Sequence, residues 1–162
     1  MFRPAGPTET PALVALAADT GIFQPQEAQM LLGGVLDDLH TGRLGEGHTA
    51  QVWTDAADGP PVGWVYFAPT AKADRVWDLW WIGVARVRQR QGIGDELLRF
   101  VENHVRSAGG RLLLIETSST PAFDPVRAFY IKRGYSECGV VPDFYAEGDG
   151  KVIYAKRIAA SV

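Results

Sequence analysis

The residues of this chain whose types and spacing most directly suggest chemistry form a short glycine-containing turn at residues 89–94. An apolar run from Leu79 to Val84 ends just before the turn, and a pattern typical of an amphipathic helix begins within it. The first N–H groups of a helix have no intrahelical partner and carry partial positive charge, so they bind anions such as phosphate. Gly92 and Gly94 lack a Cβ, which lets an anion approach the backbone closely. The order strand, glycine turn, helix therefore indicates a backbone anion site.

The glycine pattern alone does not identify the anion. A dinucleotide-binding turn has a third glycine, and a P-loop ends in Gly-Lys-Ser or Gly-Lys-Thr, whereas this chain reads Gly-Ile-Gly-Asp-Glu-Leu from Gly92 onward. Neither nucleotide-binding pattern is met. An ordinary strand-to-helix turn is the structural alternative.

Two motifs in order along the chain resemble those of one family. The segment Gln89-Arg90-Gln91-Gly92-Ile93-Gly94 resembles the acyl-CoA motif Gln/Arg-x-x-Gly-x-Gly/Ala of the GNAT superfamily of N-acetyltransferases. Residues 126–135 look like that family's late helix, which carries an aromatic pair and ends at a glycine followed by an aromatic residue. The resemblance, carried by residues 76–135, implies an α/β (α+β) fold. Its mixed, mainly antiparallel central sheet would be flanked by helices and contain a bulged, splayed central strand pair.

The resemblance also implies that acetyl-CoA is the cosubstrate and which residues bind it. The main chain of Ile82, Gly83 and Val84 would line the pantetheine arm and polarise the thioester carbonyl, as an oxyanion hole does. The turn residues that would bind the CoA pyrophosphate are Gln89, Arg90, Gln91, Gly92, Ile93, Gly94 and Asp95. Arg86 and Arg88 complete a basic cluster with Arg90 that either attracts the CoA phosphates or is a solvated turn.

Two carboxylates are candidate bases. An alkyl amine is mostly protonated at pH 7, so a base must remove a proton before the amine attacks. In several GNAT enzymes a glutamate six residues before the end of the bulged strand is that base, and Asp78 stands six before Val84. Asp is one methylene shorter, so we expect an intervening water. Glu116, at the end of the next strand, is the rival base. The structural alternatives are an Asp78 paired with Arg75 or another cation, and a Glu116 that orients substrate or emerges into solvent.

Other site residues follow from the resemblance. The hydroxyl of Tyr130 would protonate the departing CoA thiolate, the alternative being a core tyrosine with a hydrogen-bonded hydroxyl. Many members carry an asparagine seven residues earlier, where this chain has Phe123. The acceptor would contact the amino-terminal helices near Phe23 and an acidic loop at residues 143–149 that contains Tyr145. An acidic loop favours a cationic substrate.

The sequence pattern also predicts the elements that position these residues. Helices are expected at 10–18, from Pro25 to about Leu39, from Ile93 to about Ser107, and after a cap at Asp124-Pro125. Strands are expected at 48–54, 62–67, 75–84, 111–117, 136–141 and 152–158. In a regular strand Asp78 would share a face with Trp80, Ile82 and Val84, while Gly83 suggests a bulge.

Composition limits the classes of protein to consider. The 162 residues, 46% hydrophobic and 22% charged, predict one globular domain over residues 1–162. A formal net charge of -3 argues against a nucleic-acid partner. No apolar run approaches the length of about 20 residues needed to span a membrane, so no membrane association is expected. The three histidines are scattered, so we assign no metal.

The single cysteine, Cys138, cannot form an intramolecular disulfide, and we expect a cytoplasmic protein in which this residue is a buried small hydrophobe. The predicted function is an N-acetyltransferase that moves an acetyl group from acetyl-CoA to a primary amine by direct attack in a ternary complex. The acceptor is a small amine or a peptide or protein amine. An acyl-CoA-binding regulatory or interaction module with weak or no catalysis is the alternative, as is an unrelated α/β domain. A homodimer is expected on family analogy alone.

Overall fold

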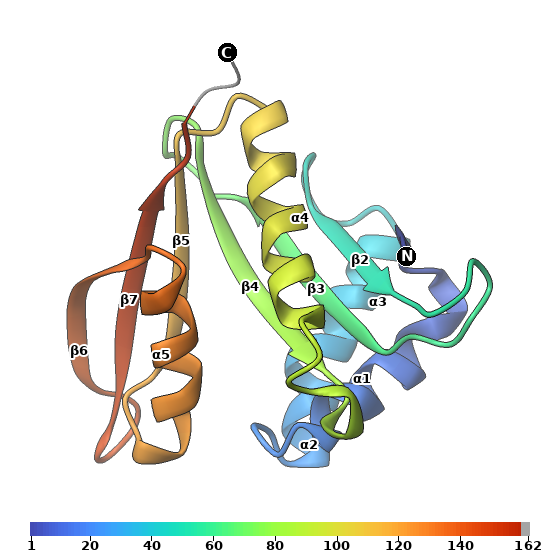
Figure 1. Cartoon of the computed structure of the whole chain (residues 1–162), viewed down its shortest axis with the longest axis horizontal. Helices are drawn as coiled ribbons and strands as arrows, with labels where there is room; N and C mark the ends of the chain where they lie inside the picture. The colour runs from blue at the N-terminus through green and yellow to red at the C-terminus, as the bar shows by residue number, and fades with distance from the viewer. Residues whose placement is uncertain (160–162) are drawn as a thin grey trace. The chain divides into compact units, whose positions relative to one another are not determined.

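The computed structural model describes residues 1–159, which form the helices and strands labelled in Figure 1. The helices are α1 (Thr10–Asp19), α2 (Pro25–Ala28), α3 (Gly34–His40), α4 (Ile93–Ser107) and α5 (Asp124–Lys132). The strands are β1 (Phe2–Pro4), β2 (Thr49–Trp53), β3 (Gly63–Pro69), β4 (Val76–Val84), β5 (Leu112–Ser118), β6 (Ser136–Ala146) and β7 (Asp149–Arg157). Their order in the sheet is β1-β2-β3-β4-β5-β7-β6. The predicted mixed, mainly antiparallel sheet with helices is confirmed.

The chain divides into two compact units. The first comprises Met1–Ala68 and Trp81–Val101, and the second comprises Pro69–Trp80 and the chain from Glu102 onward. Strand β4 and helix α4 each contribute residues to both units. The single domain expected over residues 1–162 stays a prediction.

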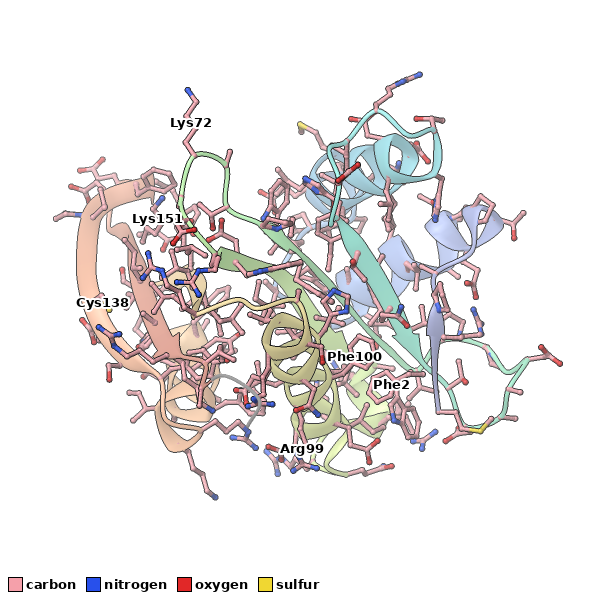
Figure 2. All side chains as sticks on the ribbon, turned by 90° about the horizontal axis from the view of Figure 1, so that it is seen from above. Phe2, Lys72, Arg99, Phe100, Cys138 and Lys151 are labelled. Carbon is pink, nitrogen blue, oxygen red and sulfur yellow. The ribbon has the colours of Figure 1, made fainter. Side chains whose placement is uncertain are left out.

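In the first unit, the two faces of β3 are covered by different helices. Trp64 and Tyr66 are buried in a core shared with α1, α2 and α3, and the indole of Trp64 donates to the carbonyl of Leu13 at 3.1 Å. On the other face, the ring of Phe67 meets Phe100 of α4. Phe100 also stacks on Phe2 of β1, with ring centroids 4.7 Å apart (Figure 2). The alternation of β3 therefore places α1–α3 and the amino-terminal part of α4 on opposite faces of this strand.

The helix that begins at Pro25 is interrupted by a π-helical turn, Gln29–Gly33, between α2 and α3. Ala28, Leu32 and Leu36 are buried, whereas Leu31 is 53% exposed. A π turn has more residues per turn than an α-helix, so residues four apart lie on the buried side there. Leu31 therefore lies outside the buried side of this helix.

In the second unit, β5 pairs with β4 in parallel and with β7 in antiparallel orientation, and β6 is the edge strand. The β4–β5 ladder runs from Val76↔Leu112 to Leu79↔Ile115 and ends there, although β5 continues to Ser118. The parallel pair implied by the resemblance is confirmed, and its splay stays a prediction.

Strand β4 contributes a buried tryptophan to each of the two units. Trp77 packs edge-on against His104 of α4, with ring centroids 5.6 Å apart. Trp81 instead joins the core beneath α1–α3, where its ring centroid lies 5.8 Å from that of Trp64. The two tryptophans are thus buried by different partners, one in each unit. The face that regular alternation would give to Asp78, Trp80, Ile82 and Val84, and the bulge suggested by Gly83, stay predictions.

Some elements differ from the predicted ones. Strand β1 was not expected, because three residues give no periodic signal. Helix α5 begins at Asp124 itself rather than being capped by it. Strand β6 extends to Ala146, and a register shift between Val141 and Ala146 accommodates Pro142 and Asp143, the latter at φ +54°. A proline is tolerated on an edge strand because its missing N–H can face away from the ladder.

Candidate active site

The turn before α4 has a backbone suited to anion binding. Arg90 and Gly92 both adopt left-handed conformations, with φ +62° and +82°. The first helical bond of α4 is donated by Glu96 to the carbonyl of Gly92 at 3.1 Å. The amides of Ile93 and Gly94 therefore precede the first intrahelical bond and are available to a ligand. A non-glycine residue at positive φ, as at Arg90, is a form of strain that often marks functional sites.

Side chains of the turn fix its shape. The amide of Gln89 donates to the carbonyl of Val84 at 3.2 Å, which ties the turn to the end of β4. The guanidinium of Arg88 donates to Gln91 Oε1 at 2.9 Å and forms two bonds, of 2.6 and 2.9 Å, with the carboxylate of Asp55. The hydrogen bond from Arg88 lowers the pKa of Asp55, and its positive charge acts in the same direction. The Arg88 guanidinium is thus bound by the side chains of Asp55 and Gln91.

The end of β4 is closely packed around Gly83. A Cβ on this residue would lie 2.4 Å from Cζ2 of the Trp81 ring, so any larger residue would displace that ring. A Cβ on Gly63 of β3 would lie 3.1 Å from the carbonyl oxygen of Gly83. Glycine at position 83 is explained by this packing. The oxyanion role of Ile82, Gly83 and Val84 stays a prediction.

The second unit contains a pocket of about 380 Å³ where the β4–β5 ladder ends. Three strands line it, through the residues Asp78, Leu79, Trp80, Leu114, Glu116 and Tyr145. Asp78 lies opposite Leu114 in the ladder, and Glu116 is two residues further along β5. The structure therefore brings together both carboxylates proposed as bases and one residue proposed to contact the acceptor.

Asp78 is partly buried in this pocket, and its Oδ2 accepts a hydrogen bond of 2.7 Å from the hydroxyl of Thr70. Burial raises the pKa of Asp78, the bond from Thr70 opposes that rise, and the negative charge of Glu116 adds to it. Arg75 is not its partner: the Arg75 guanidinium contacts Asp74, at 3.4 Å. The structural alternative of an Asp78–Arg75 pair is wrong.

Glu116 has a different environment from Asp78. Its Oε2 lies 3.3 Å from Nζ of Lys151 on β7, and its side chain is 47% exposed. The ammonium of Lys151 also lies 3.8 Å from the ring centroid of Phe144, and the Lys151 side chain is only 16% exposed. Glu116 is therefore an ion-paired carboxylate at the solvent-facing margin of the pocket.

Comparison with known proteins places the chain in a family. Residues 22–135 match the model of the Acetyltransferase (GNAT) family. The chain belongs to the GNAT family. It is therefore an acetyl-CoA-dependent acetyltransferase rather than an unrelated α/β domain. No metal-binding group of three His, Cys, Asp or Glu side chains occurs within residues 1–159, and no helix there is long and apolar enough to cross a membrane.

Solved structures agree with this assignment. A GNAT-family acetyltransferase from Desulfovibrio desulfuricans is 34% identical, with a TM-score of 0.84, covering 98% of this chain and 99% of that one. The fold is shared by an aminoglycoside 6'-N-acetyltransferase complexed with coenzyme A. That protein is 20% identical with a TM-score of 0.75, and the match covers 100% of this chain and 99% of that one. The ribosomal-protein-S18-alanine N-acetyltransferase from Escherichia coli also shares the fold, at 16% identity and a TM-score of 0.72, with 100% of this chain and 96% of that one covered. The chain matches none of the curated proteins compared with it.

In this acetyltransferase, Tyr130 is buried in an aromatic cluster of the second unit. Its ring centroid lies 5.5 Å from that of Phe129, 5.9 Å from that of Tyr135 and 6.0 Å from that of Tyr154. Burial raises the pKa of Tyr130, so the hydroxyl stays protonated at neutral pH. The cluster fixes the ring, and the catalytic role of its hydroxyl stays a prediction.

The two residues proposed to contact the acceptor lie in different units. Tyr145 lies on β6 rather than in a loop, and burial raises its pKa, with Glu116 and Asp149 adding to the rise. Phe23 lies between α1 and α2, partly buried, with its ring centroid 5.5 Å from that of Trp81. Only Tyr145 lines the pocket. The acceptor role of Phe23 stays a prediction.

Two further findings concern residues that the sequence placed wrongly or missed. Cys138 is exposed on β6, the outer strand, instead of being buried (Figure 2). Thr70 and Lys151, which bind the two carboxylates, were not singled out. Thr70 follows β3 directly in the connection to β4, so pairing these strands as a hairpin would have indicated a contact near Asp78. No comparable local signal exists for Lys151, because it reaches Glu116 from a strand more than thirty residues away.

Proposed function

We propose that this acetyltransferase moves the acetyl group of acetyl-CoA to a primary amine by direct attack in a ternary complex, with Asp78 as the base. The observation that carries the proposal is the partly buried carboxylate of Asp78 in the pocket where the β4–β5 ladder ends. A carboxyl whose pKa is raised by burial toward the operating pH is better matched to accepting a proton from an amine.

Asp78 is favoured over Glu116 because the two carboxylates differ in their partners. Glu116 is compensated by the ammonium of Lys151 and is largely open to solvent. Asp78 accepts a hydrogen bond from a neutral hydroxyl, so its negative charge is not cancelled by that partner. Glu116 would then raise the basicity of Asp78 by repulsion and attract a cationic acceptor.

The proposed reaction balances as follows. Asp78 takes one proton from the ammonium, directly or through a water, and the neutral nitrogen attacks the thioester carbon. A carbon–nitrogen bond forms while negative charge develops on the carbonyl oxygen, near the backbone amides of Ile82, Gly83 and Val84. The carbon–sulfur bond then breaks, and the nitrogen loses its second proton. The products are an acetylated amine, CoA thiol and one proton released to solvent.

We assign Tyr130 a more limited part than complete proton transfer. A free thiol has a pKa near 8.5, and a tyrosine about 10 before burial raises it. Transfer of the phenolic proton to a thiolate is therefore uphill. In the proposed mechanism the Tyr130 hydroxyl stabilises the departing thiolate as a hydrogen-bond donor, and solvent supplies the final proton.

The donor side of the proposal rests on the turn before α4. The left-handed Arg90 and Gly92, and the leading amides of Ile93 and Gly94, suit the CoA pyrophosphate. Gln89, Gln91 and Asp95 complete the proposed contact segment.

Both proposed acceptor classes suit the pocket. Asp78, Glu116 and Tyr145 would bind a cationic amine, and about 380 Å³ is near the lower end of ligand-pocket volumes. A small amine would fit within it, as would the terminal residue of a peptide or protein. Aminoglycoside and ribosomal-protein acetyltransferases among the structural neighbours represent these two classes.

The proposal is tested by measuring CoA thiol release against a panel of small amines and amino-terminal peptides. We expect Asp78→Asn to lower kcat/KM by about 10²- to 10⁴-fold, the usual contribution of a general base. Tyr130→Phe should lower kcat by about 10- to 10²-fold, the value of one hydrogen bond to a charged group such as a thiolate. Asp74→Asn is the matched control, because Asp74 is an exposed carboxylate of the same unit outside the pocket. Wild-type activity in Asp78→Asn would refute the base assignment, and acetyl-CoA binding without thiol release would support a binding module.

A further inference from the structure

Thr70 is held in place by the connection between β3 and β4. It directly follows Pro69, the last residue of β3, and its N–H donates to the carbonyl of Val76 at 2.8 Å. Its own carbonyl accepts a bond of 3.4 Å from the amide of Ala73. The backbone of Thr70 is thus fixed at both its donor and its acceptor, which gives the hydroxyl a defined origin.

The Thr70 hydroxyl uses its one proton on the carboxylate of Asp78. Oγ1 lies 2.7 Å from Oδ2 of Asp78, a normal length for a hydroxyl donating to an oxygen. A carboxylate has two oxygens and about four lone-pair sites. The bond to Oδ2 therefore restricts the orientation of the carboxylate while leaving Oδ1 and further lone pairs for a substrate ammonium or a bridging water.

We propose that Thr70 is a positioning residue for this enzyme: its hydroxyl orients the carboxylate of Asp78 and favours the ionised form that accepts the substrate proton. This inference rests on the proposed role of Asp78 as the base.

The electrostatic surroundings of Asp78 make the Thr70 bond consequential. From β5, Glu116 opposes ionisation through its negative charge, and burial opposes it too. From β6, the neutral Tyr145 lines the same pocket. From β7, Lys151 is ion-paired with Glu116 and so offsets the negative charge that Glu116 presents to Asp78. Within residues 1–159, the only hydrogen bond to this carboxylate is donated by Thr70.

The direction of the effect follows from which form is active. A donor to the ionised carboxylate lowers its pKa, so loss of the hydroxyl raises that pKa. The base functions only when deprotonated, and the acidic limb of the kcat/KM profile therefore moves to higher pH. Thr70→Val retains the β-branched shape and the backbone bonds while removing the hydroxyl.

The experiment compares pH profiles of kcat/KM for wild type, Thr70→Val and Thr70→Ser. It is paired with ¹³C NMR titration of the Asp78 carboxyl in the same proteins. We expect Thr70→Val to raise the apparent pKa of the acidic limb and the pKa of the Asp78 carboxyl, each by about one unit. Thr70→Ser should restore both values. Thr49→Val is the control, because the Thr49 hydroxyl donates to the carbonyl of Gly47 and lies outside the pocket.

The outcomes separate the two proposals. An unchanged carboxyl pKa in a folded Thr70→Val protein would overturn the inference about Thr70. A raised carboxyl pKa with an unmoved kcat/KM profile would instead overturn the role of Asp78 as base, while the effect of Thr70 on the carboxylate would stand. Thermal unfolding of each variant establishes that the compared proteins are folded.

Discussion

The turn before α4 and the pocket at the end of the β4–β5 ladder differ in the groups that they offer to a ligand. The turn offers backbone: two left-handed residues and the leading amides of a helix, with Arg88 already bound to Asp55. The pocket offers side chains, two carboxylates whose charges interact. Backbone amides do not titrate, whereas a partly buried carboxylate does. We therefore expect donor binding to be insensitive to pH and acceptor chemistry to depend on it.

The strongest challenge to this contrast is Gly92→Ala. Alanine resists φ +82° at a cost of roughly 1–2 kcal/mol, while a Cβ there would meet no atom within 4 Å, so conformation alone is changed. We expect the acetyl-CoA dissociation constant, measured by calorimetry, to rise about tenfold at every pH tested. Gly42→Ala is the control, since Gly42 has φ +69° and open surroundings elsewhere in the first unit. A pH-dependent loss of affinity would remove the contrast.

A second prediction concerns the stability of Asp78→Asn. Burial raises the folded-state pKa of Asp78 above its unfolded value, so the ionised side chain destabilises the fold at neutral pH, and this cost disappears as pH falls through the folded pKa toward the unfolded one. We expect Asp78→Asn to raise Tm by about 1–3 °C at pH 7 and to have no effect near pH 4. Thermal unfolding followed by circular dichroism measures this. An Asn variant less stable than wild type at pH 7 would contradict it.

The smallest expected effect is that of Lys151→Met. Removing the ammonium leaves the charge of Glu116 uncompensated, which raises the pKa of Asp78 further. The acidic limb of kcat/KM should move up by a few tenths of a pH unit, less than in Thr70→Val, while acetyl-CoA affinity stays constant. Lys72→Met, which removes an exposed lysine of the same unit, is the control (Figure 2). A shift larger than that of Thr70→Val would mean that Glu116 dominates the site.

The same contrast explains what the sequence could predict. The turn was recognisable because its function depends on local order: a strand, glycines at fixed spacing and an amphipathic helix. Asp78 and Glu116 were identified as candidates from their strand positions together with the family resemblance, and both line the pocket.

The remaining features depend on pairing between distant strands. The ion pair of Lys151 with Glu116 requires the β5–β7 register, in which Glu116 lies opposite Ile153. Pro142 and Asp143 resembled a turn locally, yet the ladder with β7 resumes at Ala146. The π turn is likewise a tertiary adjustment, which propensity and periodicity do not register.

The edge position of β6 has a consequence for how this enzyme can diversify. Among the strands of residues 1–159, the one that carries Tyr145 pairs in the sheet only with β7, and it already contains a register shift and a proline. Within this strand Asp143 accepts a hydrogen bond from Gly148 and Phe144 contacts the ammonium of Lys151, whereas Tyr145 lines the pocket. We expect a directed-evolution library at position 145 to vary acceptor preference while keeping the acetyl donor unchanged, because the proposed acceptor pocket includes no residue of the turn before α4.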